Sequence, residues 1–113
     1  MNIVNYNDPD LILTGVDIGG TDMFSYQGQP FTGIIQEFDN NNNLMYELSY
    51  VNGFKEGVQK YYFPNGQLEH EYKEKNNLTV DYLKVWDNQG NLIYHSIHDA
   101  NGEITSVLIN NLP

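Results

Sequence analysis

The chain has 113 residues, a formal net charge of −10 and no cysteine, which excludes a disulfide scaffold, a thiolate metal site and a cysteine nucleophile. Its hydrophobic fraction of 40% includes nine Tyr, five Phe and one Trp, so the composition predicts one folded domain over residues 1–113 rather than a disordered chain. The N-terminus shows no secretory signal, and no apolar run approaches the roughly 20 residues of a membrane helix. We therefore expect a soluble cytoplasmic protein.

The charge is unevenly distributed along the chain. Residues 1–54 hold seven acids and no Lys or Arg, residues 55–84 hold all five Lys and five acids, and the rest adds three acids. A field of this sign repels phosphate backbones and anionic lipid, which disfavours direct binding to nucleic acid or membranes. It would attract a basic protein partner. The alternative is that the acidity only keeps a Tyr-rich sheet soluble.

Residues 1–25 are the least regular part. Short strands are expected at 11–13 and 16–18, interrupted by glycine, with another at 21–26. We expect this segment to pair with the first edge of the main sheet. The stretch 16–21 (Val-Asp-Ile-Gly-Gly-Thr) resembles the phosphate-1 motif of sugar kinases. That superfamily needs two domains and a second phosphate loop, so an ordinary hairpin turn is the better interpretation.

From Tyr26 the sequence repeats with a period of 24 residues, shown by the aromatic column Phe38, Tyr62 and Trp86. Fixed-period similarity is typical of repeat architectures. Each unit contains two turn signals roughly 11–13 residues apart, which suits a β-hairpin. The pattern predicts an all-β fold, a single-layer antiparallel meander of stacked hairpins with roughly eight or nine strands. Residues 26–98 would form three repeats, residues 99–113 a C-terminal strand, and the aromatic column part of the core.

The segment Tyr50–Leu68 resembles the MORN repeat variant through its pattern Tyr-x-Asn-Gly-x-x-x-Gly-x-x-x-x-Tyr-x-Pro-Asn-Gly-Gln-Leu. Residues 30–33 (Pro-Phe-Thr-Gly) resemble the usual opening of such arrays. The third unit departs from the pattern, because Asn77 and Asp81 stand where the second unit has glycine. The resemblance implies stacked hairpins in an elongated, twisted sheet. Because this variant is common in antitoxin and immunity proteins of bacterial toxin systems, it also implies an inhibitor that binds a toxin.

Charge and resemblance together predict an immunity protein or antitoxin of bacterial competition. It would neutralise a cognate toxin with a basic C-terminal domain, such as a nuclease, by direct binding and electrostatic occlusion. We expect the contact residues to be acids of the base-free part, with one Tyr and one further Glu: Asp17, Asp22, Glu37, Asp39, Glu47, Tyr61 and Glu71. No catalytic, cofactor-binding or metal residue is predicted, and free strand edges would permit a homodimer.

Two other classes of function stay open at this point. Longer MORN repeats suggest a structural or membrane-surface interaction scaffold, which would need a basic strip to bind lipid. A small hydrolase would use a carboxylate pair such as Glu69 and Glu71, but the chain has neither Arg nor a Gly-x-Ser-x-Gly elbow. His95 and His98 lie three apart on an expected strand and so point to opposite faces, which argues against a shared metal. The sequence therefore predicts a protein that is not an enzyme.

Overall fold

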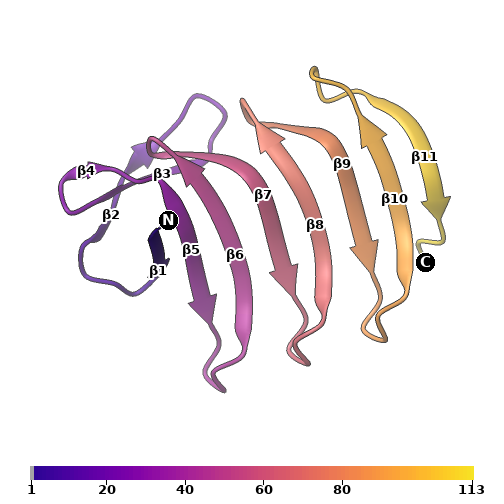
Figure 1. Ribbon diagram of the computed structural model, residues 1–113, viewed down its shortest axis with the longest axis horizontal. Coiled ribbons are helices and arrows are strands. Elements are labelled where there is room, and N and C mark those ends of the chain that lie inside the picture. Colours follow the sequence, from indigo (N-terminus) through magenta and orange to yellow (C-terminus); the bar gives the residue numbers. More distant parts are fainter. Residues whose placement is uncertain (1) are drawn as a thin grey trace.

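The computed structural model describes residues 2–113, so that Met1 of the predicted domain lies outside the described part (Figure 1). Every regular element in this range is a β-strand: β1 (Asn2–Asn5), β2 (Leu11–Val16), β3 (Asp22–Tyr26), β4 (Gln29–Pro30), β5 (Gly33–Phe38), β6 (Leu44–Val51), β7 (Phe54–Tyr62), β8 (Leu68–Lys75), β9 (Leu78–Trp86), β10 (Leu92–His98) and β11 (Ile104–Asn110). Strands β5 to β11 follow one another in an open antiparallel meander. This arrangement confirms the predicted all-β meander of hairpins.

The N-terminal segment accounts for the strands beyond the predicted eight or nine. Strand β1 pairs in parallel with β5 and extends the main sheet to eight strands, whereas β2, β3 and β4 form a separate antiparallel sheet. The expected strand at 11–13 is part of β2, which continues to Val16 with a register shift between Leu13 and Gly15. Residues 17 and 18 of the second expected strand belong instead to the turn that follows β2. The three-stranded sheet lies over one end of the main sheet (Figure 1). The expected single layer therefore does not extend to this end.

Two kinds of turn connect the hairpins. Where β6 joins β7 and β8 joins β9, Asn52-Gly53 and Asn76-Asn77 form two-residue turns. Both positions of each turn have positive φ (50° and 88°, 53° and 63°), as the type I′ turn requires. The other kind spans five residues, with the first backbone N–H donating to the fifth carbonyl. These turns are 17–21, 39–43, 63–67, 87–91 and 99–103.

Aspartate begins four of the five-residue turns. In each of these the carboxylate accepts the backbone N–H groups of the third and fifth residues, as Asp87 does from Gln89 and Asn91 at 3.0 and 2.9 Å. A short polar side chain that bonds to its own backbone two residues on is a common turn device. The stretch 16–21 contains one of these turns, which agrees with the hairpin interpretation.

The core lies where the two sheets meet. Its buried side chains form one cluster, made of Val4, Leu11, Phe24, Phe31, Ile35 and Tyr50. Phe24 from the small sheet meets Tyr50 from the main sheet edge to face, with ring centroids 5.5 Å apart. We call the face of the main sheet that carries Ile35 and Tyr50 the inner face, and the opposite face, which carries Gln36 and Glu47, the outer face. The cluster holds the three-stranded sheet on the inner face of β5 and β6.

The predicted core column of Phe38, Tyr62 and Trp86 is wrong. Phe38 is 37% exposed, and Tyr62 and Trp86 are only half-buried. Phe38 and Tyr62 lie on the outer face by alternation, because Glu37 and Tyr61 before them lie on the inner face. The hydroxyl of Tyr62 donates to Glu47 at 2.5 Å. No element of residues 2–113 covers the outer face, so the column cannot become a core.

Candidate protein-interaction site

The predicted contact residues do not form one surface. They lie on the outer face of the main sheet, on its inner face, and at turns and strand ends. On the outer face, Glu47 and Glu71 lie on either side of Lys60, each paired with it across neighbouring strands. On the inner face, Glu37 is paired with Tyr46, which is paired in turn with Tyr61. Because paired residues on neighbouring strands share a face, these two groups cannot contact one flat partner together.

Several of these acids are engaged in internal hydrogen bonds. Tyr46 donates to Glu37, and Tyr82 donates to Glu71. Burial alone would raise the pKa of Glu47, but hydrogen bonds from Tyr62 and Gln36 outweigh it and hold that pKa below its ordinary value. The side chains of Glu37, Glu47 and Glu71 are therefore held in place by these hydrogen bonds, and their negative charges occupy fixed positions on the surface.

The remaining predicted acids occupy turns and strand ends. Asp17 and Asp39 each begin a five-residue turn, and their carboxylates are used within it. Asp39 lies at the far end of the hairpin from the small sheet. Asp22 is exposed at the start of β3, where its backbone carbonyl accepts the hydroxyl of Tyr50 at 3.1 Å. Asp17 and Asp22 lie together at the turn between β2 and β3, apart from the two groups on the main sheet.

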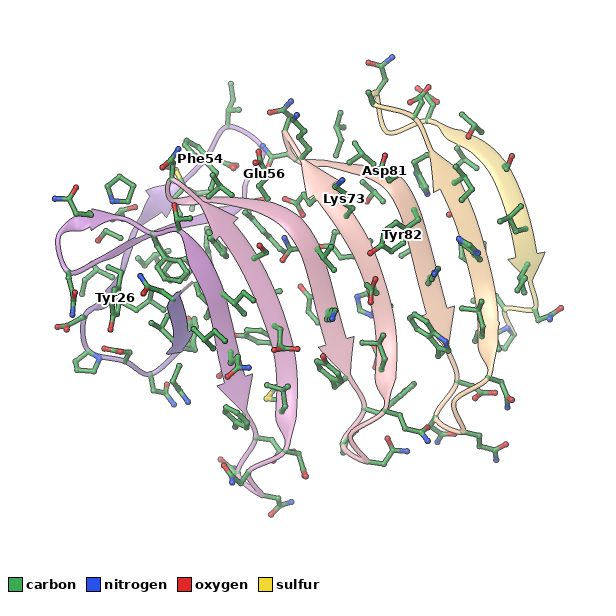
Figure 2. All side chains as sticks on the ribbon, viewed as in Figure 1. Tyr26, Phe54, Glu56, Lys73, Asp81 and Tyr82 are labelled. Atoms are coloured by element: carbon green, nitrogen blue, oxygen red, sulfur yellow. The ribbon has the colours of Figure 1, made fainter. Side chains whose placement is uncertain are left out.

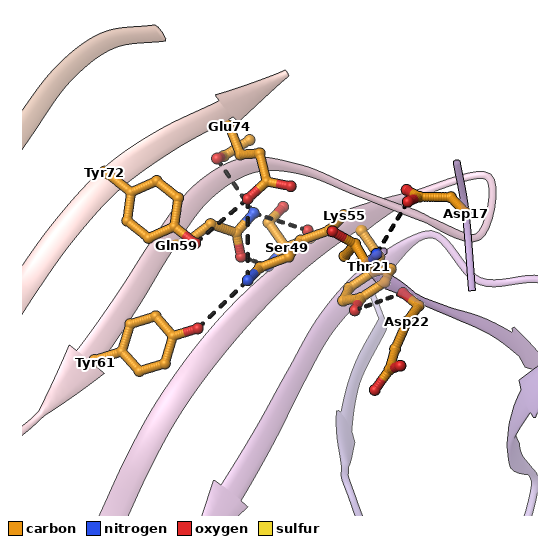
Figure 3. A network of polar contacts seen from close by, with 11 residues as sticks. Asp17, Thr21, Asp22, Ser49, Lys55, Gln59, Tyr61, Tyr72 and Glu74 are labelled. Atoms are coloured by element: carbon orange, nitrogen blue, oxygen red, sulfur yellow. Dashed lines mark hydrogen bonds and ion pairs between the residues drawn. The ribbon is translucent and has the colours of Figure 1, made fainter. Parts of the chain in front are cut away.

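Tyr61, predicted as an exposed anchor, is half-buried in an inner-face stack. Its ring lies parallel to that of His70, with centroids 4.4 Å apart. Its hydroxyl accepts a hydrogen bond from Lys55 at 3.4 Å, and the ammonium of Lys55 lies 4.0 Å from Glu74 and 5.8 Å from the ring centre of Tyr72 (Figure 3). Tyr61 thus helps to hold a lysine and is not free for a partner.

Burial acts on both charges of this ion pair. Burial raises the pKa of Glu74. Burial also disfavours the charge of Lys55, but Tyr72, Tyr61 and Glu74 outweigh it and raise the pKa of Lys55 above its ordinary value. At neutral pH the Lys55 cation is therefore retained, and its charge is balanced inside the protein.

Gln59 is fully buried beside the Lys55–Glu74 pair. Its side chain replaces backbone hydrogen bonds that are missing between β6 and β7. The register between β6 and β7 shifts after Leu48, which leaves backbone groups without strand partners. The amide of Gln59 accepts the N–H of Ser49 at 3.0 Å and donates to the carbonyls of Ser49 and Gly57 at 3.0 and 3.3 Å (Figure 3). The sequence offered only the glycine at 57 as a signal of this irregularity.

A groove of about 730 Å³ opens beside Lys55, between the small sheet and the hairpin ends of the main sheet. The turn after β2 forms one wall, and the turns between β6 and β7 and between β8 and β9 form the other. The lining residues are Asp17, Ile18, Met23, Val51, Asn52, Phe54, Lys55, Glu56, Asn76 and Asn77. Sequence reasoning missed this groove, because three segments far apart in the chain build it.

The outer edge of the small sheet exposes apolar side chains. Among residues 2–113 no strand pairs with β2 on this side, and its Ile12, Leu13 and Val16 are 52%, 55% and 59% exposed. The adjoining acids Asp10 and Asp22 are exposed too. Isolated exposed apolar residues are normal on a protein surface, but three along one free strand edge suit an interaction surface.

The fold and this surface define an open hairpin-repeat scaffold. Residues 31–52 and 55–74 match the family model of the MORN repeat variant. The first match contains β5 and β6, and the second covers nearly all of β7 and β8, so each matched repeat is one hairpin. The matches support the MORN repeat family for this part of the chain, and such repeats suggest a protein-interaction scaffold.

Neither the curated proteins nor the solved structures contain a match to this chain. Within residues 2–113 there is no helix of the length and hydropathy that crossing a membrane requires.

Proposed function

We propose that this protein is a cytoplasmic immunity protein or antitoxin that binds a basic toxin domain and occludes its active surface. The resemblance of the repeats to the MORN repeat variant supports this proposal. So does the all-acidic, base-free N-terminal part, which places an apolar strand edge among negative charges. An apolar patch with a charged rim is the usual composition of a specific protein interface.

The observation that carries the proposal is the coincidence of charge and apolar exposure on the small sheet. Residues 2–54 hold seven acids and no Lys or Arg, and the nearest lysine along the chain, Lys55, is balanced by Glu74. A toxin that binds phosphate backbones has a positive surface, which this end of the scaffold would attract and cover. Asp10, Asp22 and the edge of β2 are the contacts that we expect.

The test is binding to a toxin encoded beside this protein's gene, measured by calorimetry at several salt concentrations. Asp22→Lys should weaken binding by about tenfold or more at low salt. Glu103→Lys is the matched control, because it makes the same charge change at the opposite end of the main sheet. Equal losses in the two variants would mean that only net charge matters and would sink the proposed surface. An intact interaction in Asp22→Lys would do the same.

A structural or membrane-surface scaffold is the second candidate, which the MORN repeats support equally at the level of the family. On the outer face, Lys60 and Lys84 alternate with Glu47 and Glu71 across successive strands, so no continuous basic strip forms there. Flotation with vesicles rich in anionic lipid separates the two candidates. Recovery of the protein with the vesicles at physiological salt would favour the scaffold at a membrane.

A further inference from the structure

We propose that the groove beside Lys55 binds an extended segment of a partner protein in which a bulky apolar residue stands next to Lys or Arg. This inference rests on the proposed function only in that the segment would belong to the toxin. The volume of about 730 Å³ lies within the range of side-chain and ligand pockets.

The apolar residue of the bound segment is inferred from the apolar side chains that line the groove and are exposed to solvent. Ile18 at the tip of the turn after β2 is fully exposed, and Val51 and Phe54, a cross-strand pair next to the Asn52-Gly53 turn, are exposed as well. Figure 2 shows Phe54 and Glu56 at this end of the main sheet. Water-exposed apolar groups around a concavity gain stability when a bulky apolar side chain covers them.

The basic part is inferred from the charges. Asp17, Lys55 and Glu56 line the groove, but Lys55 already pairs with Glu74 at 4.0 Å. No cation among residues 2–113 forms an ion pair with Asp17 or Glu56. The groove is therefore net negative, which favours a Lys or Arg and rejects an acidic segment or a phosphate.

The walls are held in place before any partner arrives. Gly19 lies so close to the side chain of Asn77 that a Cβ at position 19 would come within 2.4 Å of it. This contact fixes the β2–β3 turn against the β8–β9 turn. The amides of Asn52, Asn76 and Asn77 also line the groove, and amide groups can hydrogen bond to the backbone of an extended chain. A preorganised groove loses little entropy on binding.

The experiment titrates the full chain with the short peptide Gly-Lys-Phe-Leu-Lys-Gly, followed by amide chemical shifts and fluorescence anisotropy. We expect shift changes confined to residues 17–20, 51–56 and 76–77. Two comparison peptides replace both Lys by Glu or both apolar residues by Ser, and we expect each to bind at least about tenfold more weakly. Equal binding of the Ser peptide would indicate unspecific attraction and overturn the proposal, as would shift changes elsewhere.

Variants of exposed lining residues provide the second arm. Phe54→Ser and Glu56→Lys should each weaken peptide binding by about tenfold, whereas Val107→Ser and Glu103→Lys, on and next to β11, should not. A toxin that binds Phe54→Ser as tightly as the unchanged protein would leave the proposed function standing and overturn the groove's part in it. If the neighbouring toxin does not bind at all, the function fails, and the peptide titration still decides whether the groove is a site.

Discussion

Gly57 and Asp81, one repeat apart, occupy equivalent positions on β7 and β9 and both adopt positive φ, 99° and 63°. Glycine reaches this region at no steric cost, and aspartate tolerates it better than most residues. Asn77 likewise takes a φ of 63° where the second unit has Gly53 at 88°. The two departures of the third unit from the repeat pattern therefore preserve its backbone.

The first prediction concerns Asp81. Asp81→Val should lower the free energy of unfolding by about 1–2 kcal/mol, because a β-branched residue is strained at positive φ. Asp81→Gly should change it by less than about 0.5 kcal/mol, since the ion pair with Lys73 on the surface is worth little (Figure 2). Urea unfolding measures both. Ser106→Val on β11 is the control, and a cost there equal to that of Asp81→Val would contradict the backbone explanation.

The second prediction concerns Gln59. Gln59→Leu should cost about 3 kcal/mol, because it leaves backbone groups of Ser49 and Gly57 without partners in a buried place. Denaturant unfolding of the variant checks this value. Gln89→Leu makes the same change at an exposed turn and should be nearly neutral. Similar values for the two variants would show that Gln59 does not replace the missing ladder bonds.

The third prediction is a double-mutant cycle on Lys55 and Glu74. Each single change, Lys55→Met or Glu74→Gln, removes one partner of a mostly buried ion pair and should destabilise the protein by about 2–3 kcal/mol. The double variant should lose less than either single variant, because no uncompensated charge remains. Strictly additive losses in thermal and urea unfolding would mean that the two charges do not interact.

The fourth prediction concerns acid stability. Backbone N–H groups, Asn43 for Asp39 and Asn91 for Asp87, hold the pKa of each turn carboxylate below its ordinary value of 3.8. A folded-state pKa below the unfolded one gives a contribution that is complete above pH 3.8 and is lost as the pH falls through the lower folded value. Stability should therefore decline below about pH 4.

The double variant Asp39→Asn/Asp87→Asn checks this assignment. Asparagine keeps an oxygen acceptor for the turn but cannot titrate, so unfolding free energies measured from pH 7 to pH 3 should show a shallower acid decline than those of the unchanged protein. Glu103→Gln is the control, because it removes a titrating group that is exposed and accepts no turn hydrogen bond. An unchanged acid slope in the double variant would place the responsible carboxylates elsewhere.

The hairpins could be predicted because their turns depend on local chemistry. Asn52-Gly53 specifies its turn through positive φ at two adjacent residues, whatever the rest of the chain does. The small sheet could not be predicted in the same way, since its place depends on Phe24 meeting Tyr50 from a distant strand. Alternation places Phe38 on the outer face, opposite to Glu37, but alternation alone does not tell which of the two faces a second sheet will cover.

Of the candidate site, only its negative charge and its place in the N-terminal part could be predicted from the sequence. The run of residues 1–54 without Lys or Arg indicates the N-terminal part, in which Asp17 and Asp22 lie at the same hairpin turn. Glu37, Asp39 and Glu47 share the part of the chain without Lys or Arg, yet alternation and the turn geometry place them on different surfaces. The sequence carries no signal for Ile18 and Phe54, because only the packing of two sheets brings them to one groove.

The position of the buried cluster affects how the protein unfolds and where hairpins can be gained or lost in evolution. All six members lie between Val4 and Tyr50, whereas β11 is exposed along nearly its whole length. In a stacked array each hairpin depends mainly on its neighbours, so amide hydrogen exchange should be slowest near β5 and β6 and become faster toward β11. Duplication or loss of a hairpin would then be tolerated best at the C-terminal end, where evolution could lengthen the array without disturbing its recognition end.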